Sequence, residues 1–158
     1  MKKEFDEVFE KGAKNYCPSC GVGGTKDDEC THMTCPNCHT VWCYVCEKKE
    51  SEVDKSPDQV DDIYAHNADW KTNPKRCPMY LTEIEDVDDR WPGDETNALE
   101  LFHRLKLLRV LNEFVTKIGL LEFEKLKEVF PSVANCGMTQ KEIMETDNTL
   151  IYRKKEVN

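Results

Sequence analysis

The spacing of cysteines constrains this chain more than any other feature of its sequence. Seven of its nine cysteines lie between residues 17 and 46, and six of those form three C-x2-C pairs: Cys17/Cys20, Cys35/Cys38 and Cys43/Cys46. A C-x2-C turn places two thiolates on one side of a tight knuckle, where both can reach one zinc ion at about 2.3 Å. So short a segment buries little apolar surface, and we therefore expect bound metal to hold it together.

Two four-coordinate sites need a fourth pair of ligands, and His66 with Cys77 can supply it. The first zinc is expected on Cys17, Cys20, Cys35 and Cys38, and the second on Cys43, Cys46, His66 and Cys77. The 19 residues between Cys46 and His66 leave this last pair less determined by spacing. His32 and His39 therefore remain competing ligands.

Disulfide bonds are the alternative to zinc for such a segment. The first ten residues are charged throughout and show no signal peptide, and no apolar run reaches the length of a membrane span. These features predict a reducing compartment, cytoplasmic or nuclear, and favour zinc. The net charge of −9 argues against nucleic-acid binding and suits basic protein partners.

Cys30 is not needed by either predicted zinc site, and His32 follows it two residues later. A spare cysteine beside a histidine in a metal-stabilised loop is a candidate nucleophile. The competing interpretation is that Cys30 is buried or metal-bound and that His32 is a loop residue or a spare ligand. A second isolated cysteine, Cys136, is interpreted as incidental.

Residues 16–82 carry the motif Y-C-P-S-C, then C-T-H-M-T-C-P-N-C, then V-W-C-Y-V-C, and finally I-Y-A-H and R-C-P. This order resembles the catalytic zinc domain (Rcat) of the RING-between-RING ubiquitin-protein ligases. The resemblance includes the position of Cys30, the histidine two residues later, the following methionine and the aromatic residue before Cys43. It covers about half of the chain.

The resemblance implies a catalytic activity and two protein partners. Cys30 would take ubiquitin from the thioester of a ubiquitin-conjugating enzyme, and His32 would act as general base when an amine attacks the new thioester. Positioning matters more than driving force here, because thioester exchange is nearly isoenergetic. The family's function therefore implies ubiquitin and a ubiquitin-conjugating enzyme as partners.

The chain departs from the family pattern at three points. Glu29 stands where a glycine commonly precedes the nucleophile, and with Asp27 and Asp28 it opposes formation of the Cys30 thiolate. Val41 stands where some members carry a carboxylate that assists the histidine, so either the enzyme is slower or another acid such as Glu29 orients His32. Nothing in these residues resembles the first RING or the in-between domain.

The remaining sequence predicts helices around this module. We expect a helix within residues 1–15, with Phe5, Val8, Phe9 and Gly12 on one face, the zinc domain over 16–82, an acidic linker over 83–96 and a helical domain over 97–158. Within the zinc domain, residues 47–62 are expected to form a polar, mobile loop. Thr96 is the expected cap of a helix over 97–118, a second helix follows over 120–130, and the T-x-x-E box at Thr139 starts a third.

The predicted fold is thus a small zinc-stabilised, loop-rich α+β module followed by an all-α region that folds on its own core. A non-catalytic zinc-binding interaction module, with its helices recruiting a helical protein partner, is the alternative function. Cys30 and His32 favour the enzyme, whereas the acidic flank and the missing first RING favour the interaction module. A nucleic-acid zinc ribbon is disfavoured by charge.

Overall fold

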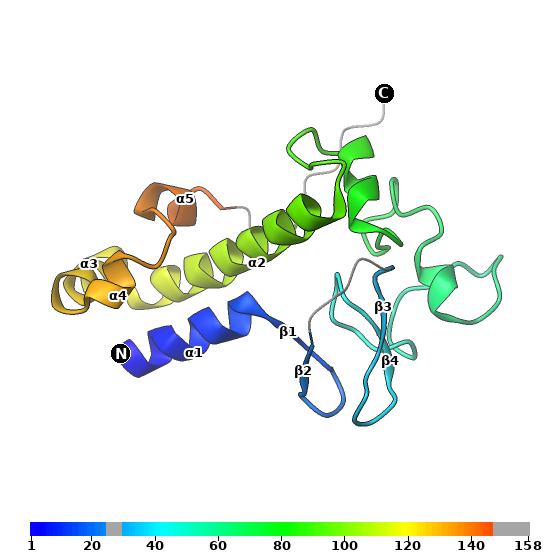
Figure 1. Ribbon diagram of the computed structural model, residues 1–158, viewed down its shortest axis with the longest axis horizontal. Coiled ribbons are helices and arrows are strands. Elements are labelled where there is room, and N and C mark those ends of the chain that lie inside the picture. Colours follow the sequence, from blue (N-terminus) through cyan, green and yellow to red (C-terminus); the bar gives the residue numbers. More distant parts are fainter. Residues whose placement is uncertain (25–29, 147–158) are drawn as a thin grey trace. The chain divides into compact units, whose positions relative to one another are not determined.

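The computed structural model describes residues 1–24 and 30–146 (Figure 1). Within them the chain forms two compact units: residues 14–101, which hold the cysteine pairs, and residues 1–13 together with 102–146, which are helical. The predicted fold class is confirmed, because a module of short strands and loops precedes a helical region. None of the described helices is long and apolar enough to cross a membrane.

The cysteine-rich unit contains two small antiparallel hairpins (Figure 1). In the first, β1 (Asn15–Tyr16) pairs with β2 (Gly23–Gly24). In the second, β3 (His32–Thr34) pairs with β4 (Val41–Cys43), so that His32 lies opposite Cys43 and Met33 opposite Trp42. Each hairpin turns at a C-x2-C pair, and the strands therefore aim the thiolates of that pair at one point.

All three C-x2-C pairs fold into the same knuckle. The amide that follows the second cysteine donates to the carbonyl of the first, with N···O distances of 2.9, 2.9 and 2.8 Å for Gly21, His39 and Glu47. That following residue has a positive φ in every case, 79°, 62° and 60° respectively. Only Gly21 adopts this conformation without a steric cost, so the other two knuckles carry local strain.

The segment after the third knuckle is more ordered in its contacts than its polar composition predicts. Val53 and Ser56 are buried, and the amide of Ser56 donates to the carbonyl of Ala65 at 3.0 Å. The prediction of a mobile loop over residues 47–62 is therefore wrong for its middle part. This anchoring precedes a short 3-10 helix, η1 (Ile63–His66), which carries His66.

A second 3-10 helix, η2 (Leu81–Asp86), crosses the predicted boundary between the zinc domain and the acidic linker. Its apolar residues Leu81 and Ile84 are fully buried, as is the nearby Trp91. The acidic side chains of this stretch thus alternate with residues that belong to the core of the unit. The apolar positions pack this stretch into the unit, and the acidic Asp88 is buried with them.

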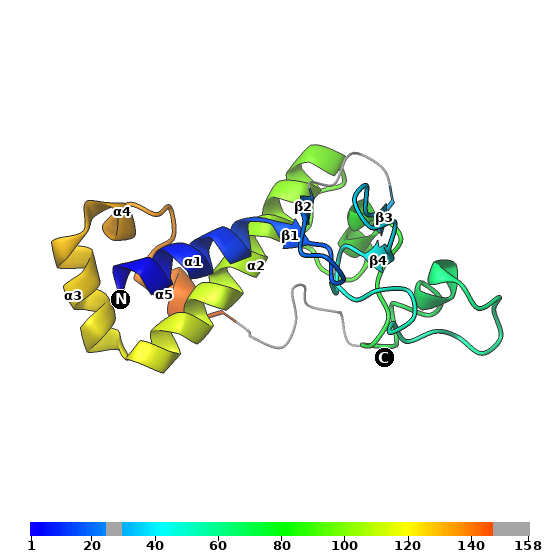
Figure 2. The same cartoon turned by 90° about the horizontal axis from the view of Figure 1, so that it is seen from below.

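The helical unit contains α1 (Lys2–Ala13), most of α2 (Glu95–Ile118), α3 (Leu120–Val129), α4 (Pro131–Ala134) and α5 (Gln140–Met144) (Figure 2). The prediction that Thr96 caps α2 is wrong. The cap is Asp94, because its carboxylate accepts from the amide of Asn97 at 3.0 Å. The predicted capping box at α5 is confirmed, with Thr139 and Glu142 bonding to each other's backbone amides.

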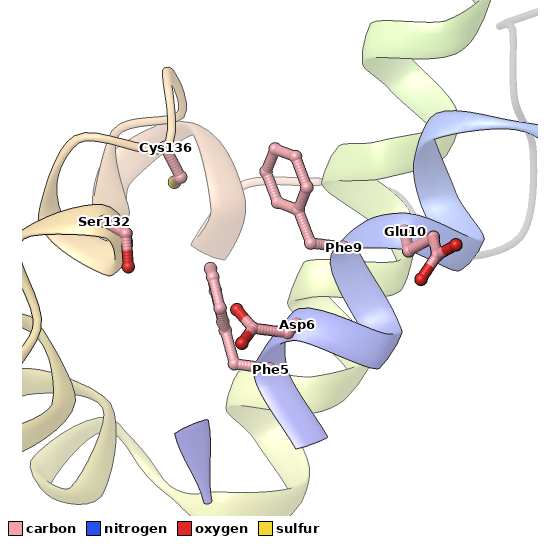
Figure 3. Close-up of a pocket in the computed structure, with 6 residues that line it drawn as sticks. All are labelled: Phe5, Asp6, Phe9, Glu10, Ser132 and Cys136. Atoms are coloured by element: carbon pink, nitrogen blue, oxygen red, sulfur yellow. The ribbon is translucent and has the colours of Figure 1, made fainter. Parts of the chain in front are cut away.

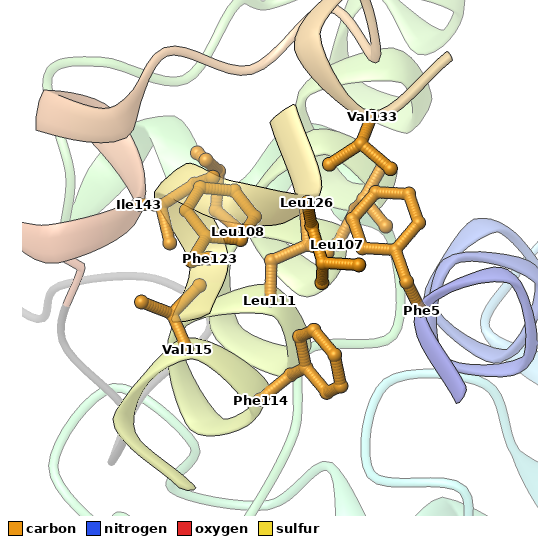
Figure 4. Close-up of a cluster of buried hydrophobic side chains, with 10 residues drawn as sticks. All are labelled: Phe5, Leu107, Leu108, Leu111, Phe114, Val115, Phe123, Leu126, Val133 and Ile143. Atoms are coloured by element: carbon orange, nitrogen blue, oxygen red, sulfur yellow. The ribbon is translucent and has the colours of Figure 1, made fainter. Parts of the chain in front are cut away.

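The core of the helical unit includes a side chain from the N-terminal helix (Figure 4). Phe5 of α1 is 3% exposed and meets Phe114 of α2 edge-on, with ring centroids 6.0 Å apart. A Cβ added at Gly12 would lie 2.5 Å from Val110 Cγ2, so α1 packs closely along α2. The helical region after residue 97 therefore shares its core with α1.

Cys136 lines a pocket on this unit, which α1 forms with the segment around α4 (Figure 3). The aromatic rings of Phe5 and Phe9 provide the apolar wall of the pocket. The Cys136 thiol lies 3.7 Å from the carbonyl of Met138, to which it donates. Cys136 lies in the helical unit and belongs to neither cysteine cluster.

Candidate metal centres and a candidate active site

The first cysteine cluster joins the two hairpins. Its members are Cys17, Cys20, Cys35 and Cys38, and their sulfur atoms all lie within 4.8 Å of one another. The Cys17–Cys38 and Cys20–Cys35 sulfur pairs are each 3.5 Å apart. Tetrahedral coordination with Zn–S bonds of about 2.3 Å places sulfur atoms roughly 3.8 Å apart, so this cluster fits a structural zinc ion.

The second cluster brings together residues that are far apart in sequence. Cys43, Cys46, His66 and Cys77 offer ligand atoms that all lie within 4.8 Å, with 3.6 Å between Cys46 Sγ and His66 Nε2. The other ring nitrogen of His66, Nδ1, donates to the carbonyl of Asp54 at 2.6 Å. This bond fixes the tautomer that leaves Nε2 free to bind metal, which is the usual support for a zinc-bound histidine.

The protein environment favours the thiolate form that zinc requires at some of the ligands, whereas it raises the pKa of Cys35, Cys43 and Cys77. Hydrogen bonding from the Thr40 hydroxyl and backbone lowers the pKa of the Cys38 thiol to about 6. Contacts with Cys43 and Cys77 hold the pKa of Cys46 well below its usual value. The two clusters thus fit two zinc sites, with the ligands predicted from the spacing.

The two competing histidines are not part of either cluster among the described residues. His39 is exposed and occupies the strained position after Cys38. His32 hydrogen-bonds instead to the side chain of Asn67. Neither imidazole is therefore positioned as a zinc ligand in this structure.

Cys30 also lies outside both clusters and is half-buried. The residue after it, Thr31, is fully buried and bonds to two other segments. Its amide donates to the Met79 carbonyl at 2.7 Å, its hydroxyl donates to the Pro78 carbonyl at 2.8 Å, and its carbonyl accepts from the Tyr44 amide at 2.8 Å. Cys30 and His32 are thus held on either side of an anchored residue.

His32 is surrounded by protein on two sides. Its ring meets that of Tyr64 edge-on, with centroids 4.6 Å apart, and its Nε2 lies 2.6 Å from Asn67 Oδ1. Burial lowers the pKa of the imidazole below its usual value, although the Asn67 contact opposes this effect. His32 is therefore neutral at neutral pH, which is the form that can accept a proton.

The structure tests the sequence interpretation of this site only in part. Asp27, Asp28 and Glu29 lie outside the described residues, so the predicted influence of the acidic run on Cys30 stays a prediction. Sequence reasoning did not identify Asn67 as a neighbour of His32. The only hint of Asn67 in the sequence is that it directly follows the ligand His66. This position does not by itself predict a contact with His32.

Comparison with known proteins agrees with this geometry. Residues 13–55 match the IBR domain family. Over 78 residues, or 48% of this chain, the sequence is 29% identical to the E3 ubiquitin-protein ligase RNF217 of Xenopus laevis, and the alignment covers 28% of that protein. The RNF217 proteins of Mus musculus and Homo sapiens are 28% identical over the same length, which is 15% and 14% of their chains. No solved structure matched the chain.

Residues 13–55 are thus similar to IBR zinc domains, so the expectation that nothing in these residues resembles the in-between domain is wrong. The predicted resemblance to the zinc domains of RING-between-RING ubiquitin ligases is confirmed. The aligned region spans less than a third of each of the three relatives.

Proposed function

We propose that this zinc domain transfers ubiquitin through Cys30. In the first step the Cys30 thiolate attacks the carbonyl carbon of a ubiquitin thioester on a conjugating enzyme. A new C–S bond forms, the old one breaks, and the conjugating enzyme leaves as a thiolate. In the second step an acceptor amine attacks the Cys30 thioester, a C–N bond forms, Cys30 leaves as a thiolate, and His32 takes the proton lost by the amine.

One observation carries this proposal. Cys30 is excluded from both metal clusters, remains partly accessible and is held by Thr31 beside a neutral histidine. The similarity to proteins named as E3 ubiquitin-protein ligases supports the proposed ubiquitin transfer. We place the protein in a reducing compartment, cytoplasmic or nuclear, where zinc-binding thiolates stay reduced.

The test is to mix the chain with a ubiquitin-loaded conjugating enzyme and look for an adduct that reductant removes. The wild-type chain should form this adduct, and Cys30→Ala should not. His32→Ala should still form the thioester but discharge it to lysine more slowly, by roughly a hundredfold, because the base acts only when the amine attacks. If the wild-type chain forms no adduct under any condition, the proposed ubiquitin transfer through Cys30 is wrong.

The second candidate is a non-catalytic zinc-binding module that recruits a protein partner. It is favoured by the burial of His32 Nδ1, which has no hydrogen-bond partner and which solvent does not reach in this conformation. An amine could use that nitrogen only after the residues that cover it move. If Cys30 does not react with small alkylating reagents and no thioester forms, the non-catalytic interaction module is the better description.

A further inference from the structure

The side-chain amide of Asn67 lies between the His32 ring and the second zinc site. Its Oδ1 is 2.6 Å from His32 Nε2, and its Nδ2 donates to the carbonyl of Cys77 at 2.8 Å. A carbonyl oxygen only accepts hydrogen bonds, so the NH2 group of the amide must face Cys77. The amide oxygen therefore faces His32, and Nε2 of the histidine must carry the proton of this hydrogen bond.

The position of Asn67 is itself set by residues of the second metal cluster. It directly follows the ligand His66, and its side chain bonds to the backbone of the ligand Cys77. The Cys77 amide in turn donates to the His66 carbonyl at 3.3 Å. The geometry that assembles the cluster thus also fixes the acceptor that His32 meets.

We propose that Asn67 is a positioning residue for His32. It holds the ring in one orientation and leaves Nδ1 as the unprotonated nitrogen. That atom is buried in this conformation, so it takes the proton of the attacking amine once the residues that cover it move. When His32 becomes positively charged, the Oδ1 acceptor stabilises the charge through a hydrogen bond that already exists. Asn67 thereby takes the orienting role for which position 41 offers only a valine. This inference rests on the proposed ubiquitin transfer.

The experiment measures thioester formation and thioester discharge separately, in the full chain, for Asn67→Ala, His32→Ala and the double variant. We expect Asn67→Ala to form the Cys30 thioester at the wild-type rate and to discharge it to lysine about tenfold more slowly. In the His32→Ala background, Asn67→Ala should have no further effect, because it acts through the missing ring. Asn67→Asp, which keeps an acceptor oxygen for His32 but loses the donor to the Cys77 carbonyl, should recover part of the discharge rate.

Two controls separate positioning from loss of structure. Native mass spectrometry should find two zinc ions in every variant. Asn73→Ala removes an asparagine from the same segment, one whose side chain accepts from the Lys75 amide, and it should leave discharge unchanged. The Nε2–H proton of His32 should also give a slowly exchanging NMR resonance in the wild-type chain that is lost in Asn67→Ala.

The outcomes are distinguishable. Normal discharge by Asn67→Ala, or an equal slowing in the presence and absence of His32, overturns the inference and leaves the proposed function intact. Loss of one zinc ion together with the discharge defect assigns Asn67 to the metal site and also overturns it. A wild-type chain that forms no thioester overturns the proposed function, and the inference falls with it. In that case the resonance still reports the hydrogen bond.

Discussion

Arg76 donates a hydrogen bond from Nε to Oδ2 of Asp54 at 2.6 Å. The same aspartate accepts from His66 Nδ1 through its backbone carbonyl, so Arg76 secures the residue that orients a metal ligand. Arg76 is buried, and its Nη1 donates to the Ala68 carbonyl at 2.8 Å. The guanidinium also holds the pKa of the Asp54 carboxyl below its usual value, chiefly through its hydrogen bond to that carboxyl.

Replacing Arg76 with alanine should weaken zinc binding at the second site. Loss of the supporting contact frees Asp54, and changes of this kind lower metal affinity by roughly ten- to a hundredfold. Competition with a chromophoric chelator measures the affinity of each site. Lys75→Ala, at the neighbouring exposed position, is the matched control. Equal affinities for Arg76→Ala and wild type would show that Asp54 orients His66 without help.

Removing a single ligand should remove a single metal ion. Cys77→Ser should bind one zinc, whereas Cys30→Ala should bind two, because Cys30 belongs to neither cluster. Native mass spectrometry counts the ions directly. A strong chelator should unfold the cysteine-rich unit, since structural zinc binding contributes on the order of 10 kcal/mol of folding free energy per site. Loss of an ion from Cys30→Ala would make Cys30 a ligand.

The strained knuckles predict stabilising substitutions. His39→Gly and Glu47→Gly should each raise the stability of the zinc-bound chain, by up to about 1 kcal/mol, because glycine relieves a φ of 62° or 60°. Thermal unfolding with saturating zinc measures the change, and both zinc ions should remain in His39→Gly. Ser19→Gly, within the first knuckle but at a different position, should bring no such gain. A destabilised His39→Gly variant would show that the imidazole makes a needed contact.

The contact between α1 and α2 predicts that the N-terminal helix stabilises the helical unit. Phe5→Ala should lower the free energy of unfolding of this unit by about 3–4 kcal/mol, because it leaves a cavity beside Phe114. Chemical denaturation followed by circular dichroism, with chelator present, reports the helical unit. Lys3→Ala, on the exposed side of α1, should change little. An unchanged denaturation midpoint for Phe5→Ala would show that α1 does not contribute to the stability of this core.

His103 should make the helical unit sensitive to mild acid. Burial, followed by the charge of Lys106, lowers the pKa of its imidazole below the usual value near 6.5. As the pH falls below that value, the unfolded chain takes up a proton before the folded chain does, so stability is lost through the folded pKa. The difference in stability between wild type and His103→Gln, measured from pH 7.5 to about pH 5, should therefore shift in favour of the variant. A difference that stays constant across this range would contradict the assignment.

Periodic and closely spaced signals in the sequence predicted much of the structure. The stripe of Phe5, Val8, Phe9 and Gly12 predicted the buried face of α1, and the T-x-x-E box predicted the start of α5. The cap of α2 was missed, because Thr96 and Asp94 are both good caps, and in the structure it is Asp94 that accepts from the amide of Asn97. Local chemistry alone does not distinguish two such neighbours.

The sequence by itself determined the metal chemistry, because three C-x2-C pairs, one histidine and one further cysteine supply the donors of two zinc sites and leave Cys30 over. Only the tertiary structure decided what His32 meets. Asn67 is 35 residues away along the chain, and it comes within 2.6 Å of the imidazole because His66 and Cys77 converge on the second cluster. A contact that forms through metal-directed folding leaves no periodicity in the sequence, since its energy lies in long-range geometry rather than in local preference.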